Sequence, residues 1–112
     1  MIVIRQGDAY PIPLHLCHPG EVLTPEQIQD MEICVGHQIR RLYSRGEVIY
    51  DPIDRMWLLR LSQWDTLRLE PGDYEIQARI KYPSIPGDGE DVRTIWLDNE
   101  IIVLPGTSKE VL

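Results

Sequence analysis

Hydrophobic and polar residues alternate most regularly between Tyr74 and Tyr82. From Tyr74 onward every second side chain is apolar or aromatic, and the intervening ones are Glu, Gln, Arg and Lys. This period of two predicts a β-strand with one face buried and the other in water. Pro71 and Gly72 predict a turn immediately before the strand.

Shorter alternating or apolar runs predict further strands, separated by turn residues at intervals of about 8–12 residues. They cover residues 2–5, 10–16, 31–36, 38–43, 47–50, 56–61 and 92–104, with a bulge at Asp98-Asn99 in the last. Ser44-Arg45-Gly46 predicts a hairpin between segments 38–43 and 47–50. Residues 17–23 are expected to form a loop, and residues 83–91 a flexible acidic loop. About seven short strands of this kind are typical of an all-β sandwich.

Two capping patterns predict short helical turns between strands. Thr24 precedes Pro25, and Gln27 stands at the spacing of a capping box. Ser62 and Asp65 repeat this spacing in a weaker form. We expect the second turn to cross from one strand to the Pro71-Gly72 turn.

The segment 10–16 carries the signature of an edge strand. Pro11 and Pro13 lack backbone N–H groups and lie two apart, so both remove donors from the same lateral edge. Ile12 and Leu14 remain able to pair on the other side. Such an edge is protected from unwanted strand addition.

Composition sets further bounds. With 112 residues, the chain is expected to form one domain over residues 1–105, followed by a flexible tail over residues 106–112. A net charge of −7 argues against binding nucleic acid or an anionic membrane.

We find no secretion signal or membrane-spanning run, so we expect a protein made in the cytoplasm, where its cysteines stay reduced. Arg40-Arg41 could dock an acidic neighbour, although a solvated pair is favoured.

Five residues of the two types that most often bind zinc form the sharpest chemical possibility, namely His15, Cys17, His18, Cys34 and His37. Zinc requires four convergent ligands, and this spacing matches no established zinc signature. Free thiols and solvated histidines are therefore expected, without a bound metal or other cofactor. The acidic segment Asp88–Asp91 lacks the calcium-loop pattern of an EF-hand and is expected to be a solvated turn.

The three tryptophans suggest a surface for binding. Trp57 lies in an apolar run and is expected in the core, whereas Trp64 and Trp96 are expected to be exposed. An exposed aromatic residue marks a protein interface or a carbohydrate site. We therefore predict interface residues at Trp64 and Trp96, and at Tyr10 and Ile12 of the edge strand. No catalytic constellation is recognisable, so an enzyme is not expected.

Several motifs carry a resemblance to known proteins. Pro71-Gly72-x-Tyr74 at the start of a long strand resembles the tyrosine corner of immunoglobulin-like sandwiches, where the hydroxyl bonds back to the upstream backbone. With Ile4–Asp8, the segment from Gly89 through Trp96 to Val103, and the tail Ser108–Leu112, the chain resembles the immunoglobulin-like N-terminal domain of phage and prophage baseplate upper proteins. The insert 24–30 and the loop 83–91 depart from that pattern.

The resemblance implies an antiparallel immunoglobulin-like sandwich in which Pro71, Gly72 and Tyr74 define the fold. It implies a structural module of a phage tail, baseplate or neck that docks to other subunits or to copies of itself. Such a module would become part of a virion. The alternative is a small ligand-binding module, for carbohydrate through exposed tryptophan or for a metal through the His/Cys group.

Overall fold

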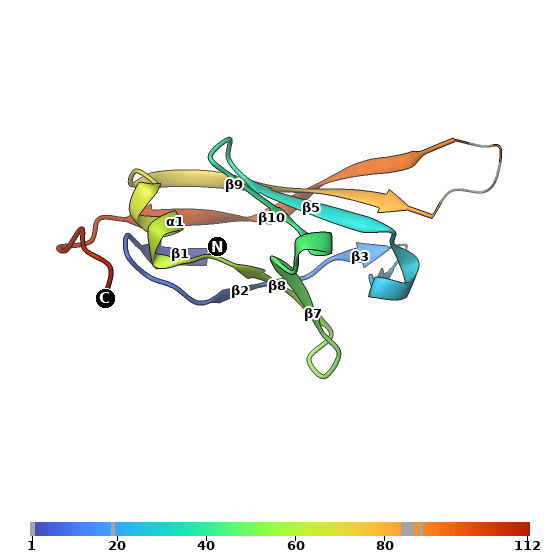
Figure 1. Cartoon of the computed structure of the whole chain (residues 1–112), viewed down its shortest axis with the longest axis horizontal. Helices are drawn as coiled ribbons and strands as arrows, with labels where there is room; N and C mark the ends of the chain where they lie inside the picture. The colour runs from blue at the N-terminus through green and yellow to red at the C-terminus, as the bar shows by residue number, and fades with distance from the viewer. Residues whose placement is uncertain (1, 19, 84–86, 88) are drawn as a thin grey trace.

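The chain folds into two facing β-sheets and a short two-stranded ribbon (Figure 1). The computed structural model describes residues 2–18, 20–83, 87 and 89–112. One sheet has the strand order β1 (Ile2–Arg5), β10 (Asp91–Leu104), β9 (Gly72–Tyr82), β5 (Asp30–Val35), β6 (Ile39–Leu42). The second has the order β2 (Pro11–Leu14), β8 (Met56–Arg60), β7 (Val48–Asp51), and the ribbon comprises β3 (Cys17–His18) and β4 (Glu21–Val22).

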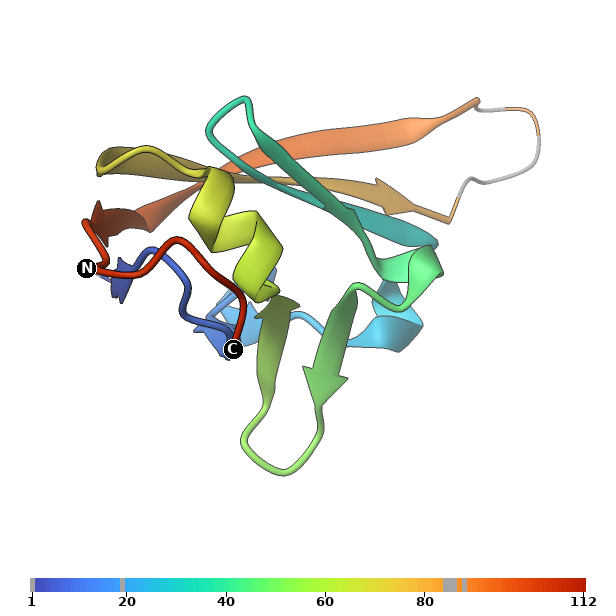
Figure 2. The same cartoon turned by 60° about the vertical axis from the view of Figure 1, so that its left-hand side comes forward.

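The core lies between the two sheets, which Figure 2 shows one above the other. In β9 the buried residues Ile76, Ala78 and Ile80 alternate with outward polar ones, as the sequence pattern predicts. The second sheet contributes Trp57 and Leu59 of β8 to the core, and both side chains are fully buried. The fold is therefore all-β with two facing sheets, and Trp57 is a core residue as expected.

The predicted hairpin between β6 and β7 is wrong. β6 pairs with β5, and β7 pairs with β8 in the other sheet. The short helix η2 (Tyr43–Arg45) carries the chain across, and Gly46 in the left-handed conformation ends it. The hairpin turn lies instead at Gly36, whose φ of +55° favours glycine.

A second correction concerns strand direction, because β1 runs parallel to β10. Local alternation identifies strands but says nothing about which distant strand they pair with. All other pairings are antiparallel, and the register between β9 and β10 shifts between Trp96 and Glu100, which confirms the predicted irregularity. The expected loop 17–23 contains the β3–β4 ribbon, in which Cys17 lies opposite Val22.

The edge position predicted for β2 is confirmed, because β2 is an outer strand of its sheet. Its partner is β8, with Ile12 opposite Leu59 and Leu14 opposite Trp57. Ile12 and Leu14 are each 1% exposed. The Ile12 side chain belongs to the core and its backbone lies opposite Leu59 of β8, which corrects its assignment as an interface residue.

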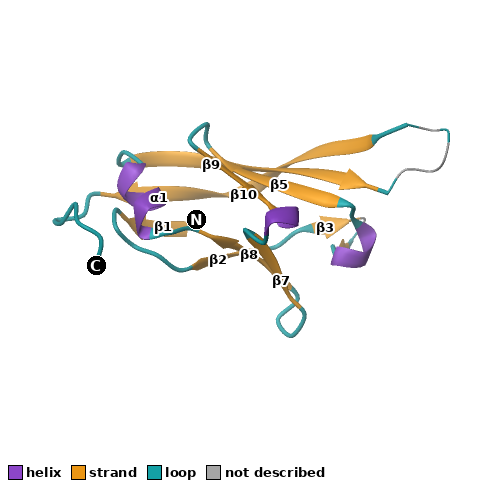
Figure 3. Ribbon diagram, viewed as in Figure 1, coloured by secondary structure: helices purple, strands orange, loops and turns teal. Residues whose placement is uncertain are grey.

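The turns around α1 (Gln63–Arg68) fix the approach to β9 (Figure 3). Ser62 Oγ accepts a hydrogen bond from the Asp65 N–H at 3.2 Å, and Asp65 Oδ2 accepts one from the Ser62 N–H at 2.8 Å. This is the predicted capping box. The Tyr74 hydroxyl donates to the Glu70 carbonyl at 2.6 Å, so the predicted hydrogen bond back to the upstream backbone is present. At the other predicted cap, the Thr24 N–H donates to Gln27 Oε1 at 3.0 Å before η1 (Pro25–Gln27).

The helix α1 also anchors the segments near both chain ends, which lie on the same side of the molecule (Figure 2). Thr66 Oγ1 donates to the Asp8 carbonyl at 2.7 Å and accepts from the Gly7 N–H at 2.9 Å. The Leu112 N–H donates to Gln63 Oε1 at 2.6 Å. Leu112, the last residue of the segment expected as a flexible tail, thus contacts α1. No helix of the described residues combines the length and apolarity needed to cross a membrane.

Candidate functional site

The outer face of the five-stranded sheet is the most prominent candidate surface for interaction. Strand register places Trp96 of β10, Gln77 of β9 and Cys34 of β5 in one row across it. Trp96 is 61% exposed, which confirms the expected exposure. Val92 precedes it on the same face and is also exposed. An exposed tryptophan beside a β-branched residue is the kind of surface that partners bury.

Charged groups flank this row on its β5 and β6 side. Glu32 is almost buried and forms an ion pair with Arg40. Its Oε1 atom lies 3.2 Å from Nε of Arg79. Burial alone would raise the pKa of Glu32, but hydrogen bonds from Arg40 and the Cys34 thiol, with the charge of Arg79, lower it overall. Two guanidinium groups therefore share one ionised carboxylate.

Cys34 lies beside this carboxylate, with Sγ 3.5 Å from Glu32 Oε1. Burial and the negative charge of Glu32 raise the pKa of the Cys34 thiol. Cys17 is exposed in the ribbon, and both cysteines are free. The raised pKa disfavours the thiolate of Cys34 and so lowers the reactivity of this thiol.

The opposite end of the outer face is acidic. Asp73 and Glu75 of β9 and Glu100 of β10 lie beside one another by register. Among the described residues none of these three carboxylates has a cationic group within ion-pair distance. This acidic row offers unpaired negative charge next to the exposed Trp96.

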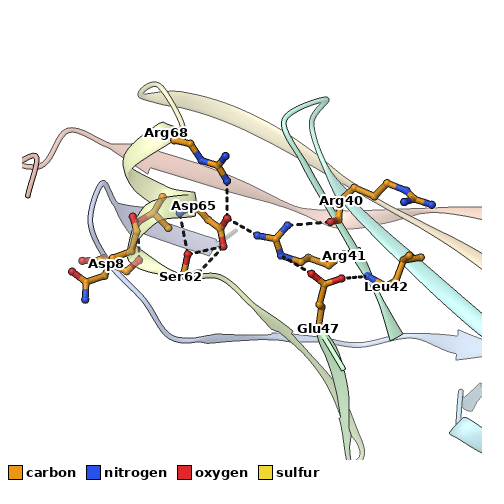
Figure 4. A network of polar contacts seen from close by, with 10 residues as sticks. Asp8, Arg40, Arg41, Leu42, Glu47, Ser62, Asp65 and Arg68 are labelled. Atoms are coloured by element: carbon orange, nitrogen blue, oxygen red, sulfur yellow. Dashed lines mark hydrogen bonds and ion pairs between the residues drawn. The ribbon is translucent and has the colours of Figure 1, made fainter. Parts of the chain in front are cut away.

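A separate polar network lies beneath the sheet and has a structural role (Figure 4). Asp65 is 5% exposed and pairs with Arg41, whose side chain is 18% exposed, and with Arg68 at 3.0 Å. Arg41 also lies 3.9 Å from Glu47. Burial would raise the pKa of Asp65, but hydrogen bonds from Arg41 and Ser62 bring it down to about 2.

This network corrects the interpretation of Arg40-Arg41 as a solvated pair. Arg41 joins β6 to α1, and Arg40 pairs with Glu32 on the other face. Sequence reasoning missed the Arg41–Asp65 pair because its members lie 24 positions apart and in different elements. The alternation in β6 was the available signal, since it puts Arg41 on the same face as the buried Ile39.

The other predicted interface residues lie apart from Trp96. Trp64 is 66% exposed on α1, as expected. Tyr10 is 41% exposed, and its hydroxyl donates to the Val3 carbonyl of β1 at 3.2 Å. Burial, with the negative charge of Asp8, raises the pKa of Tyr10. Trp64 and Trp96 thus belong to different elements, the helix α1 and the five-stranded sheet.

The candidate metal ligands are distributed over several elements. Cys17 and His18 lie in β3, Cys34 in β5 and His37 in the turn before β6, while His15 follows β2. Within the described part of the chain, no group of three or more His, Cys, Asp or Glu residues is arranged to hold a metal ion.

At the base of the acidic loop, two of the described carboxylates contact cationic side chains of the neighbouring strands. Asp88 of the calcium candidate lies outside the described residues. Glu90 Oε1 lies 3.5 Å from Nζ of Lys81, and Asp91 Oδ1 accepts from Nε of Arg93 at 3.0 Å. These carboxylates are used in ion pairs with neighbouring strand residues.

Comparison of the chain with protein-family models, with curated proteins and with solved structures finds no match. The interpretation of its function therefore depends on the surfaces described above.

Proposed function

We propose that the chain is a non-catalytic docking module with an immunoglobulin-like sandwich, which acts in a phage or prophage tail, baseplate or neck. The exposed Trp96 on the outer face of the five-stranded sheet is the observation that carries this proposal. Its proposed partners are other structural subunits or further copies of the chain. The module would be made in the cytoplasm and would become part of a virion.

The strand order supports the immunoglobulin-like part of the proposal. One sheet follows the order β2-β8-β7, which matches strands B, E and D of an immunoglobulin sandwich. Four consecutive strands of the other sheet, β10-β9-β5-β6, match G, F, C and C′ of the variable type. The hydrogen bond from Tyr74 to Glu70 lies where such domains have their tyrosine corner.

The outer face has the size and composition of a docking surface. The lengths of the five strands and the ordinary spacing of neighbouring strands give this face a projected area of about 600 Å². Each partner in a standard interface buries about 800 Å² of accessible surface, and side-chain relief raises the accessible area above the projected one. One apolar centre with charged flanks is the usual anatomy of such an interface.

The test is the mass of the full chain in solution, measured by light scattering after size exclusion over a wide range of concentrations. We expect a discrete oligomer that Trp96→Ala dissociates and that Trp64→Ala leaves intact. Trp64 is the matched control because it is equally exposed but lies on α1. A monomer at every concentration, together with no binding partner recovered through Trp96 from a virion extract, would refute the proposal.

A further inference from the structure

The free edge of β7 combines open backbone groups with a groove that can receive another strand. A strand at the edge of a sheet presents unpaired N–H and C=O groups, which proteins ordinarily block. The two sheets have four edge strands, namely β1, β6, β2 and β7. They differ in whether the outward backbone groups of the free edge are blocked by other contacts or by proline.

The edge of β1 is closed by its own turn. The Arg5 N–H donates to Asp8 Oδ2 at 2.9 Å, and the Arg5 carbonyl accepts from the Asp8 N–H at 3.0 Å. The Val3 carbonyl accepts from the Tyr10 hydroxyl at 3.2 Å. This gives Tyr10 a local function, which is to cover the outer edge of β1.

The edge of β6 is closed by the segment that follows it. The Leu42 N–H donates to Glu47 Oε1, and the Leu42 carbonyl accepts from the Glu47 N–H, both at 3.2 Å. The Arg40 carbonyl accepts from Nη1 of Arg41 at 3.0 Å. On β2, Pro11 and Pro13 remove the outward donors.

Among the residues that the structure describes, none closes the free edge of β7 in any of these ways. The Arg60 N–H donates to the Glu47 carbonyl at 3.3 Å, so this opposite pair is hydrogen-bonded in the antiparallel register of β7 and β8. Hydrogen-bonded pairs alternate with open ones, so Ile49 and Asp51 bond to β8. The backbone groups of Val48 and Tyr50 then point outward, and among the described residues no contact closes them.

A groove runs along this free edge. Its walls are η1 and η2, and its lining residues are Pro25, Glu26, Tyr43, Ser44, Gly46, Val48, Ile49, Tyr50 and Pro52. The Tyr43 and Tyr50 rings rest on the buried Trp57, with ring centres 5.5 and 5.1 Å from it. Ser44 bonds to Asp30 through both its N–H and its hydroxyl, so the η2 wall is tied to β5.

We propose that β7 binds an extended segment of a partner protein, which adds to the β2-β8-β7 sheet as a fourth strand. This rests on the proposed docking function and assigns it a second, separate site. Outward groups at every second residue match an extended chain, because such a chain offers donors and acceptors with the same period. The aromatic floor takes apolar side chains of the segment, and exposed Glu26 with the net charge of −7 favours flanking Lys or Arg.

The test selects short peptides from a random displayed library on the immobilised full chain. The enriched peptides are synthesised, and backbone amide exchange is measured residue by residue with and without them. In the free chain we expect fast exchange at Val48 and Tyr50 and slow exchange at Ile49 and Asp51. Bound peptide should slow Val48 and Tyr50 at least about tenfold, since each gains a hydrogen bond.

Val48→Pro removes an outward backbone N–H group from β7, as Pro11 and Pro13 do on β2. It removes an outward donor without breaking a bond to β8, so we expect at least about tenfold weaker binding. Val48→Ala is the matched control, because it shortens the side chain but keeps the N–H. If the proline variant does not fold, amide exchange at Val48 and Tyr50 of the natural chain, with and without peptide, tests whether the peptide binds at β7.

Several outcomes would overturn this assignment: no enriched peptide, protection elsewhere in the chain, or equal binding by Val48→Pro. Protection of Val48 and Tyr50 that grows with protein concentration alone would identify a second copy as the occupant and also overturn it. Trp96→Ala should leave peptide binding unchanged. That result separates failure of this site from failure of the outer-face docking function.

Discussion

At the scale of single residues, the Asp65 carboxylate shows how a local pattern acquires a long-range role. It completes the capping box with Ser62 and, from the same side chain, pairs with Arg41 of β6. The sequence predicts the first of these contacts through its spacing of three. The second depends on the two sheets facing each other, which no local spacing encodes.

Asp65→Asn should lower the free energy of unfolding by about 2 kcal/mol, because it leaves the mostly buried Arg41 guanidinium without its carboxylate. Urea unfolding followed by tryptophan fluorescence measures the change. Arg68→Gln is the control, since Arg68 pairs with the same carboxylate from an exposed position and should have little effect. Equal stability of Asp65→Asn and the natural chain would contradict the structural role of this pair.

The same carboxylate predicts how stability depends on pH. Its pKa lies at about 2 in the folded chain, below its ordinary value of 3.8. The unfolded chain therefore binds more protons in this window, and the stabilisation is complete above about pH 5 and lost as pH falls toward about 2. Urea unfolding at a series of pH values should show this slope, reduced in Asp65→Asn. An unchanged slope in that variant would assign the dependence to other carboxylates, such as Glu32.

Tyr74→Phe tests the corner that directs the chain into β9. Loss of the hydroxyl removes its bond to the Glu70 carbonyl and should lower the free energy of unfolding by about 1 kcal/mol. Tyr50→Phe is the matched control, because no hydrogen bond of the Tyr50 hydroxyl is present among the described residues. Equal effects of the two changes would mean that the Tyr74 hydroxyl contributes nothing specific.

At the scale of elements, the sequence predicts strands well and their partners poorly. The alternation in β9, the prolines of β2 and both capping boxes are local signals, and the structure confirms them. Ser44-Arg45-Gly46 has the composition of a hairpin turn, yet the chain changes sheets there. Pairing depends on burial across the whole core, and so does the exclusion of Ile12 from an interface.

The turn at Gly36 offers a test of this correction. An added Cβ would lie 2.6 Å from Gln38 Oε1 and 3.0 Å from Cδ1 of Tyr74, whereas at Gly46 it would meet nothing within 4 Å. Both glycines have positive φ. Gly46→Ala should therefore cost about 1 kcal/mol for backbone strain alone, and Gly36→Ala about 2 kcal/mol. Thermal unfolding of the two variants measures these costs. A larger loss of stability for Gly46→Ala than for Gly36→Ala would contradict the assignment of the hairpin turn to Gly36.

At the scale of the whole molecule, charge decides between the two kinds of occupant proposed for the outer face. Each copy carries a net charge of −7, and the acidic row of Asp73, Glu75 and Glu100 lies beside Trp96. Two copies that meet through this face repel each other at long range. Salt screens that repulsion, since the screening length is about 10 Å at about 0.1 M ionic strength.

If copies associate through Trp96, their affinity should therefore rise several-fold between about 20 mM and about 300 mM NaCl. A basic partner would show the reverse, because salt weakens attraction between opposite charges. Light scattering follows the first case, and titration of an isolated partner follows the second. Glu75→Gln with Glu100→Gln should flatten the salt dependence in either case, since it removes charge next to the tryptophan. A salt dependence that survives this double change would place the contact away from the acidic row, at the β7 edge or on α1.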